Sequence, residues 1–202
     1  MLEKAGALPH EVVSLWSEGG SAAALSRARY YVGIRSWSLA AAELARLPED
    51  AAHAGWRAAL SGAMAFGEGR DEDGIRSWQT AVSGLTTRAD RVLQQWLVQA
   101  LGRLSTAQAS AVAEGLAEPI AAIPEMTLAL VRRLVKENEW QAADRLLAIA
   151  AQRRPEADIF RAWAELAAQQ QDAKDALGRA RHAWELSPRT PEWGRWLDQM
   201  ES

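Results

Sequence analysis

Residues 157–188 read ADIFRAWAELAAQQQDAKDALGRARHAWELSP, and this stretch decides the fold. It consists largely of good helix formers, and Pro188 ends it. Small residues recur in both halves, at Ala164 in the first and at Ala176 and Ala180 in the second. Small residues let two helix backbones approach closely, while bulky neighbours fill the remaining space. The stretch therefore predicts two helices that pack against each other as a hairpin.

The hairpin signature recurs along the chain at a nearly constant spacing. The sequence GIRSW at Gly33–Trp37 reappears at Gly74–Trp78, 41 residues later. With its glycine as a marker, equivalent small residues follow at Ala109, Ala143 and Ala176, separated by 35, 34 and 33 residues. Such a period is that of a two-helix repeat, so we expect several hairpins in series.

The rest of the chain also predicts an all-α protein. β-Branched residues are sparse and never alternate with polar residues over the length of a strand. The breaks between helices are expected at Gly19–Gly20, Pro48, Gly67–Gly74, Leu104–Ser105, Pro119, Pro124, Asn138, Pro155, Pro188 and Pro191. They leave helices of roughly 10 to 16 residues, the length usual for packed hairpins.

These hairpins resemble the tetratricopeptide repeat (TPR), whose pattern is W-x2-L-G-x2-Y, then A-x3-F, then P. In the last unit the corresponding residues are Phe160, Trp163, Ala164, Ala167, Ala176, Ala180, Ala183 and Pro188. In the unit before it they are Thr127, Leu130, Val131, Leu134, Ala143, Leu147, Ala150 and Pro155, and Asn138–Trp140 looks like the turn between its helices. The resemblance implies a right-handed α-solenoid of about five helix-turn-helix hairpins.

The resemblance divides the chain into three parts. Residues 1–20 are interpreted as an N-terminal extension with a short helix, 21–190 as the TPR-like repeats and 191–202 as a C-terminal capping helix. The helical spacing of the last part places four apolar residues on one face, namely Trp193, Trp196, Leu197 and Met200. We expect this face to cover the last hairpin, and the alternative is that it docks on another subunit or a following domain.

The resemblance also implies a concave groove lined by the first helix of each hairpin. The positions that are similar to the groove-lining positions of TPR proteins carry Arg91, Gln94, Gln95, Arg132, Lys136, Arg161, Glu165 and Gln169. Their mixed, mostly basic character predicts an acidic or extended peptide, held by charge-assisted hydrogen bonds. The alternative is an ordinary solvated surface. The Lys and Asn set that forms a carboxylate clamp in chaperone-binding TPR proteins is absent, so that ligand is not inferred.

Composition disfavours several classes of function. With 23 basic and 26 acidic residues the net charge is −3, which gives no general positive field for nucleic acid. The absence of cysteine excludes disulfides, thiol nucleophiles and cysteine zinc sites. The N-terminus has no signal-peptide pattern, and no run of about 18 apolar residues predicts direct membrane insertion. The compartment stays open: cytoplasm, or periplasm if the chain is an excised part of an exported protein.

No catalytic or cofactor motif is recognised. The histidines His10, His53 and His182 lack metal-ligand spacing, and no phosphate-binding or nucleophile motif occurs. The acidic cluster of Glu68 and residues 71–73 is expected to complement the helix dipole and cap the helix that begins near Gly74. Five of the ten tryptophans are expected in the core rather than as stacking platforms: Trp37, Trp78, Trp96, Trp140 and Trp163.

The sequence thus predicts a non-enzymatic scaffold that binds a partner protein or peptide and needs no cofactor or metal. The alternative is the helical-repeat region of a larger bacterial envelope protein, in polysaccharide export or cell-wall machinery, with tryptophans contacting glycan. A helical enzyme or an RNA-binding repeat is disfavoured, because neither catalytic spacing nor positive charge supports it. A homo-oligomer is compatible with the sequence.

Overall fold

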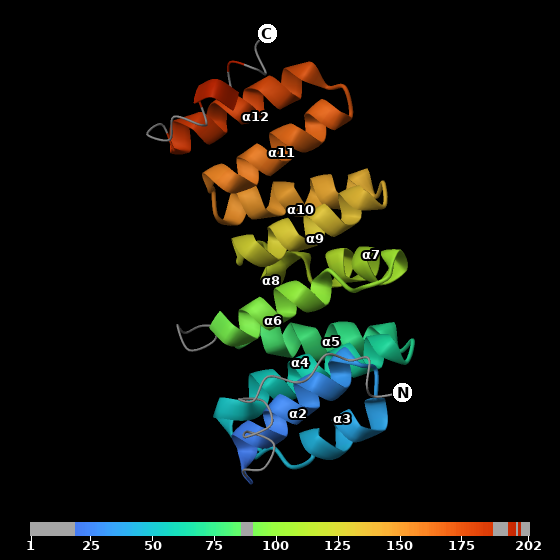
Figure 1. The fold of residues 1–202 in the computed structure, drawn as a ribbon. Helices are drawn as coiled ribbons and strands as arrows, with labels where there is room; N and C mark the ends of the chain where they lie inside the picture. Colours follow the sequence, from blue (N-terminus) through green and yellow to red (C-terminus); the bar gives the residue numbers. More distant parts are fainter. Residues whose placement is uncertain (1–18, 86–90, 188–193, 197, 199–202) are drawn as a thin grey trace. The chain divides into compact units, whose positions relative to one another are not determined.

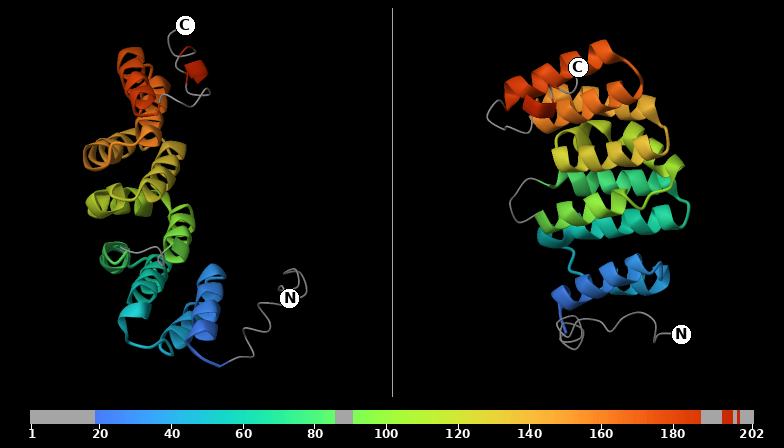
Figure 2. Two further views of the ribbon diagram at one scale, coloured as in Figure 1. Left: turned by 90° about the vertical axis from the view of Figure 1, so that its left-hand side faces the viewer. Right: turned by 45° about the horizontal axis from the view of Figure 1, so that its top comes forward.

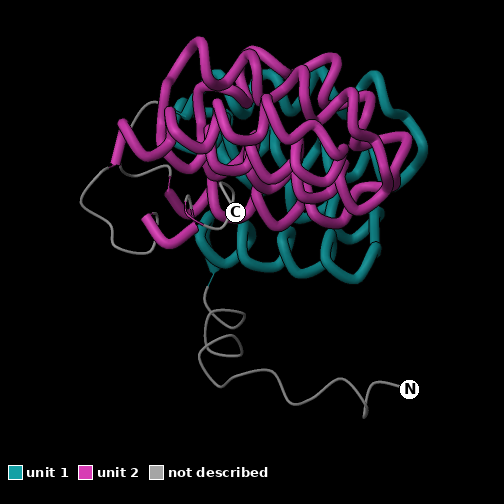
Figure 3. The backbone as a smooth tube through the Cα atoms, turned by 90° about the horizontal axis from the view of Figure 1, so that it is seen from above, with its two compact units in different colours: residues 1–86 teal, residues 87–202 magenta. Residues whose placement is uncertain are grey.

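The computed structural model describes residues 19–85, 91–187, 194–196 and 198, and all regular structure in these residues is helical. The prediction of an all-α fold is therefore confirmed. The chain divides into two compact units, residues 1–86 and 87–202 (Figure 3). The first unit contains α2 (Ser21–Gly33), α3 (Trp37–Leu44), α4 (Ala51–Gly67) and α5 (Asp71–Ser83).

All regular structure in the described part of the second unit is helical (Figure 1). It contains α6 (Arg91–Leu101), α7 (Thr106–Gly115), α8 (Ala117–Ala121), α9 (Pro124–Lys136), α10 (Trp140–Arg153), α11 (Ala157–Gln169) and α12 (Ala173–Leu186). Consecutive helices pack as the pairs α9–α10 and α11–α12, while α9 also packs against α6 and α11. In the first unit the pairs are α2–α3 and α4–α5. Figure 2 shows the two helices of each pair running side by side.

Four of the hairpins use one turn geometry. The residue two positions after the first helix has a positive φ in each: Arg35, Gly69, Asn138 and Gln171. The amide of the next residue then donates to a carbonyl five positions back, as Glu139 does to Leu134 over 2.9 Å. This is the Schellman ending of a helix, which satisfies free carbonyls and reverses the chain. The predicted turn at residues 138–140 is confirmed, and Trp140 is the first residue of α10.

The fourth residue of each second helix is small and buried. In chain order these residues are Ala40, Gly74, Ala109, Ala143 and Ala176. Their separations are 34, 35, 34 and 33 residues. In α4–α5 the two helices approach closely here, because a Cβ added to Gly62 would lie 2.2 Å from Trp78 and 3.0 Å from the Gly74 carbonyl oxygen.

The predicted register of the first repeat is wrong. Gly33 is the last residue of α2 and Trp37 the first of α3, whereas Gly74 and Trp78 both lie inside α5. The two copies of GIRSW are therefore not structurally equivalent. The true counterpart of Gly74 is Ala40, and with Ala40 as the first marker the irregular step of 41 residues becomes 34.

The capping helix predicted at residues 191–202 lies mostly outside the described residues, which there are 194–196 and 198. Residues 194–196 are helical. The ring of Trp196 lies 5.6 Å from the Arg161 guanidinium of α11, and a Cβ at Gly194 would lie 3.5 Å from Trp184 of α12. The described part of this segment thus lies against the last hairpin. The other apolar residues of the predicted face, Trp193, Leu197 and Met200, lie outside the described residues.

Tryptophan at a buried crossing should break the fold. Ala143 and Ala176 are at most 1% exposed. We expect Ala143→Trp and Ala176→Trp to destabilise the protein by about 1–3 kcal/mol or more, because the larger side chain forces the helices apart. Thermal melts would measure the loss, with Ala107→Trp on the exposed face of α7 as control. Melting within about a degree of the parent for both variants would refute the assigned crossings.

Candidate functional site

The predicted groove residues of the second unit lie on three neighbouring helices. Arg91, Gln94 and Gln95 belong to α6, Arg132 and Lys136 to α9, and the remaining three, Arg161, Glu165 and Gln169, to α11. All are exposed except Gln94, which is partly buried. Because α9 packs against both α6 and α11, the structure brings the three sets onto adjacent helices. The amide of Gln94 donates to Glu125 over 3.1 Å and joins α6 to α9.

Two neighbouring basic side chains on α9 form no ion pair within the described residues. Arg132 and Lys136 stand one turn apart on α9, and both are exposed. The Nε of Arg132 donates to the backbone oxygen of Leu128 over 3.1 Å, which leaves the terminal nitrogens facing solvent. Among the residues that the structure describes, no carboxylate forms an ion pair with either one. We name Arg132 and Lys136 the α9 cation pair.

The other basic residues near this surface are largely neutralised. Arg161 pairs with Glu165 over 3.0 Å. The remaining basic clusters of the sequence are also matched, since Arg153 pairs with Glu118 and Arg154 pairs with Glu156. The surface is therefore less basic than its sequence indicates, and within the described residues its cations without an ion pair are Arg91 on α6 and the α9 cation pair.

Arg133, next to the α9 cation pair, has a structural role. Its Nε donates to the Leu104 oxygen over 3.0 Å, and its guanidinium pairs with Glu137. Glu137 also accepts from the hydroxyl of Thr106 on α7 over 3.1 Å. The Arg133 guanidinium and, second, the Thr106 hydroxyl lower the pKa of Glu137 from its ordinary value. These bonds hold the C-terminal end of α9 against α7. They thereby fix the position of the Lys136 backbone, from which its side chain extends.

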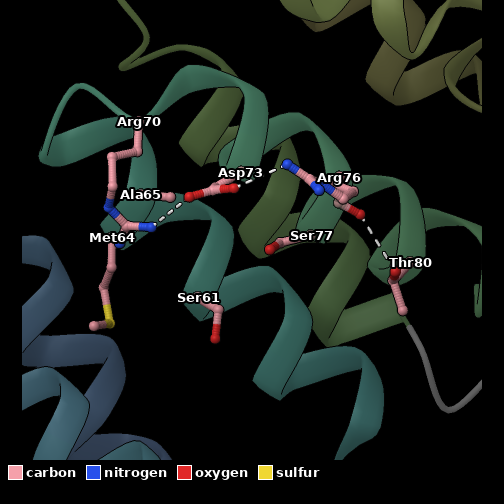
Figure 4. Close-up of a pocket in the computed structure, with 8 residues that line it drawn as sticks. All are labelled: Ser61, Met64, Ala65, Arg70, Asp73, Arg76, Ser77 and Thr80. Carbon is pink, nitrogen blue, oxygen red and sulfur yellow. Dashed lines mark hydrogen bonds and ion pairs between the residues drawn. The ribbon is translucent and has the colours of Figure 1, made fainter.

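A second candidate, missed in the sequence, is a hollow of about 500 Å³ on α4 and α5. Figure 4 shows Asp73 beside Arg76 and joined to Arg70, with Ser61 and Ser77 on the two helices. Asp73 pairs with Arg70 over 2.8 Å and with Arg76 over 3.0 Å. We name this the α4–α5 hollow, and its lining residues are Ser61, Met64, Ala65, Arg70, Asp73, Arg76, Ser77 and Thr80.

The acidic cluster lies where a helix dipole favours it. The expectation that these acids precede a helix beginning near Gly74 is wrong, because α5 begins at Asp71 and residues 71–73 form its first turn, where they still complement the helix dipole. The N-cap residue of α5 is Arg70, and its side chain forms no hydrogen bond to the free amides of the first turn. Glu68 instead pairs with Arg70 over 2.6 Å. Within the described residues no group of three metal-ligating side chains gathers.

The aromatic predictions hold fully at one residue. Trp78 is 1% exposed and donates from Nε1 to the Ala59 oxygen over 3.0 Å. The other four tryptophans expected in the core are only partly buried: Trp37, Trp96, Trp140 and Trp163. Of the histidines, His53 bonds to Asp50 and His182 to Glu185, and His10 lies outside the described residues.

Comparison with known proteins yields no match to a family model, a curated protein or a solved structure. Among the described residues, none of the helices combines the length and apolar character that a bilayer crossing requires.

The lowered pKa of Glu137 predicts a pH-dependent contribution to stability. A carboxyl whose folded pKa is depressed stabilises the fold above its ordinary pKa, about 4.3 for Glu, and loses this effect as pH falls through the lower folded value. We therefore expect Glu137→Gln to melt below the parent at pH 7, with the difference vanishing at acid pH. Thermal melts across this range would measure it.

The matched control is Glu114→Gln, because the Glu114 carboxylate is exposed and lies 3.7 Å from Arg145. It should change the melting temperature much less at every pH. An equal difference between parent and Glu137→Gln at all pH values would contradict the assigned cause.

Proposed function

We propose that this protein is a non-enzymatic scaffold, a TPR-like right-handed α-solenoid of about five hairpins that holds an acidic, extended peptide of a partner protein in a concave groove. The repeated Schellman turn and the buried small residue every 33 to 35 residues support the repeat architecture. The α9 cation pair supports the choice of partner.

The observation that carries the proposal is that two cations on one exposed face of α9, Arg132 and Lys136, form no ion pair within the described residues, whereas Arg133 between them does. Arg27, Arg57 and Arg179 also find a carboxylate within the chain. Arg91 and Arg103 are unpaired in the described residues as well, but they stand singly, whereas Arg132 and Lys136 stand one turn apart on one helix. Two unmatched cations one turn apart attract a chain segment that carries carboxylates at a similar spacing.

The neighbouring helices offer groups suited to the backbone of that segment. Gln95 of α6 and Gln169 of α11 are exposed amides, which can both donate and accept hydrogen bonds. An extended peptide lying across α9 would bring its carboxylates to Arg132 and Lys136 and its main chain to these amides. In such binding the charges orient the peptide and raise its association rate. The amide side chains hydrogen-bond to the peptide backbone.

The test begins with peptides selected from a random display library on the full chain. We expect the selected peptides to be rich in acidic residues. Their affinity for the double variant Arg132→Glu with Lys136→Glu should be about 10- to 100-fold lower than for the parent, because each reversal replaces attraction by repulsion. The melting temperature should hardly change, since exposed charges contribute little to stability. Fluorescence titration of one selected peptide and a thermal melt would measure both quantities.

The control carries the same change of net charge elsewhere. Arg103→Glu with Lys174→Glu reverses two exposed cations on other elements. It should weaken the peptide by no more than about twofold, through long-range charge alone. Equal weakening by both double variants, or selected peptides without acidic residues, would reject the α9 cation pair as the binding site.

A further inference from the structure

The α4–α5 hollow arises from one pair of positions that every hairpin shares. The seventh residue of each second helix lies sixteen residues after a partner position on the preceding helix. Four of these pairs carry large side chains, Arg27 with Glu43, Trp96 with Val112, Leu130 with Leu146 and Trp163 with Arg179. In α4–α5 the pair is Ser61 with Ser77, and both serines line the hollow. Two small side chains thus stand at positions where the other four pairs carry large ones, and in two of those pairs, Arg27 with Glu43 and Trp163 with Arg179, the large side chains are in contact.

The α11–α12 hairpin shows what occupies this space when it is filled. The Arg179 guanidinium lies over the Trp163 ring, 4.1 Å from its centroid. It donates to Asp175 over 2.9 Å, to Asp144 over 3.4 Å and to the Trp163 backbone oxygen over 3.3 Å. A guanidinium therefore fits between the helices of such a hairpin when carboxylates surround it.

The hollow retains the acid that a guanidinium needs. Asp73 is the third residue of α5, as Asp175 is the third residue of α12. Each carboxylate oxygen of Asp73 accepts one bond, from Arg70 or from Arg76, and has lone-pair capacity for another. Ser61 and Ser77 add hydroxyl acceptors, while Met64 and Ala65 provide an apolar wall for an aliphatic stem.

The charge around the hollow is mixed. Between residues 68 and 76 there are four acidic and two basic residues: Glu68, Asp71, Glu72 and Asp73 against Arg70 and Arg76. The hydrogen bonds that Arg70 donates to Glu68 and Asp73 raise the pKa of Arg70. Of these charged residues Arg70, Asp73 and Arg76 line the hollow, so a further guanidinium would share Asp73 with two arginines, and the neighbouring acids offset the charge of those arginines.

We propose that the α4–α5 hollow binds an arginine side chain from a partner polypeptide, with its guanidinium between Asp73 and the two serine hydroxyls. The planar fork of arginine suits several acceptors at once better than the compact ammonium of lysine. The counterpart of Asp144 is Ala41, so one of the two acids that hold Arg179 has no equivalent. A single arginine should accordingly bind in the millimolar range. This site is independent of the α9 cation pair.

The experiment uses the full chain labelled with ¹⁵N and N-acetyl-arginine amide as the probe. We expect saturable shifts of the Ser77 and Thr80 amide signals, with N-acetyl-lysine amide weaker and N-acetyl-glutamate amide without effect. Asp73→Asn should weaken arginine binding about tenfold, because it removes the charge that the guanidinium pairs with. Shifts that are equal for lysine, or that glutamate produces instead, would overturn the proposal.

Filling the hollow from within gives the second arm of the experiment. Ser77→Arg places an internal guanidinium where Arg179 lies in α12, and Ser61→Leu with Ser77→Leu copies the pair Leu130 and Leu146. Both variants should abolish the arginine-induced shifts at Thr80. Ser83→Arg, an exposed residue at the end of α5, is the matched control and should leave them unchanged. Binding that survives both filled variants would show that arginine binds elsewhere.

Discussion

A small, buried residue at the fourth position of each second helix is the constraint on which the hairpins depend. Only glycine or alanine occupies that place, and a Cβ at Gly74 would lie 2.8 Å from the Phe66 ring. Because the backbones meet there, side chains on either side of the crossing are held at fixed positions. The crossing therefore determines which residues reach the surface of the first helix and which meet between the helices.

Much of the fold could be predicted because its signals are local. Helix formers, breaks at proline and glycine, and buried small residues at a period near 34 depend on the nearest turn of chain alone. The register of the first repeat failed because the two copies of GIRSW are alike in sequence but differ in place, one at a turn and one within a helix. Identical short segments can adopt either state when packing, rather than propensity, decides. No local sequence pattern predicted that the chain divides into two compact units after residue 86.

The candidate sites were predictable to different extents. Placement of Arg132 and Lys136 on one exposed helix face follows from their spacing, so the sequence was sufficient. The sequence could not show that Arg133 is neutralised, because its bonds involve Leu104 and, through Glu137, Thr106, which belong to other parts of the fold. It could not show that Arg161 is neutralised, because that pairing depends on the rotamer of Glu165. The α4–α5 hollow is visible only when Ser61 and Ser77 are aligned with the filled pairs, and that alignment needs the corrected register.

Both candidate sites are places where the chain does not satisfy its own groups. On α9 a cation pair has no ion-pair partner within the described residues, and in α4–α5 a pair of serines leaves a hollow between the helices. The proposed peptide site is the first of these. A crystal structure of the full chain with an acid-rich peptide selected on it would locate that site. We expect peptide carboxylates within about 4 Å of the Arg132 guanidinium and the Lys136 ammonium, with the peptide extended across α9. A peptide bound elsewhere, with both cations still in solvent, would refute the proposed site.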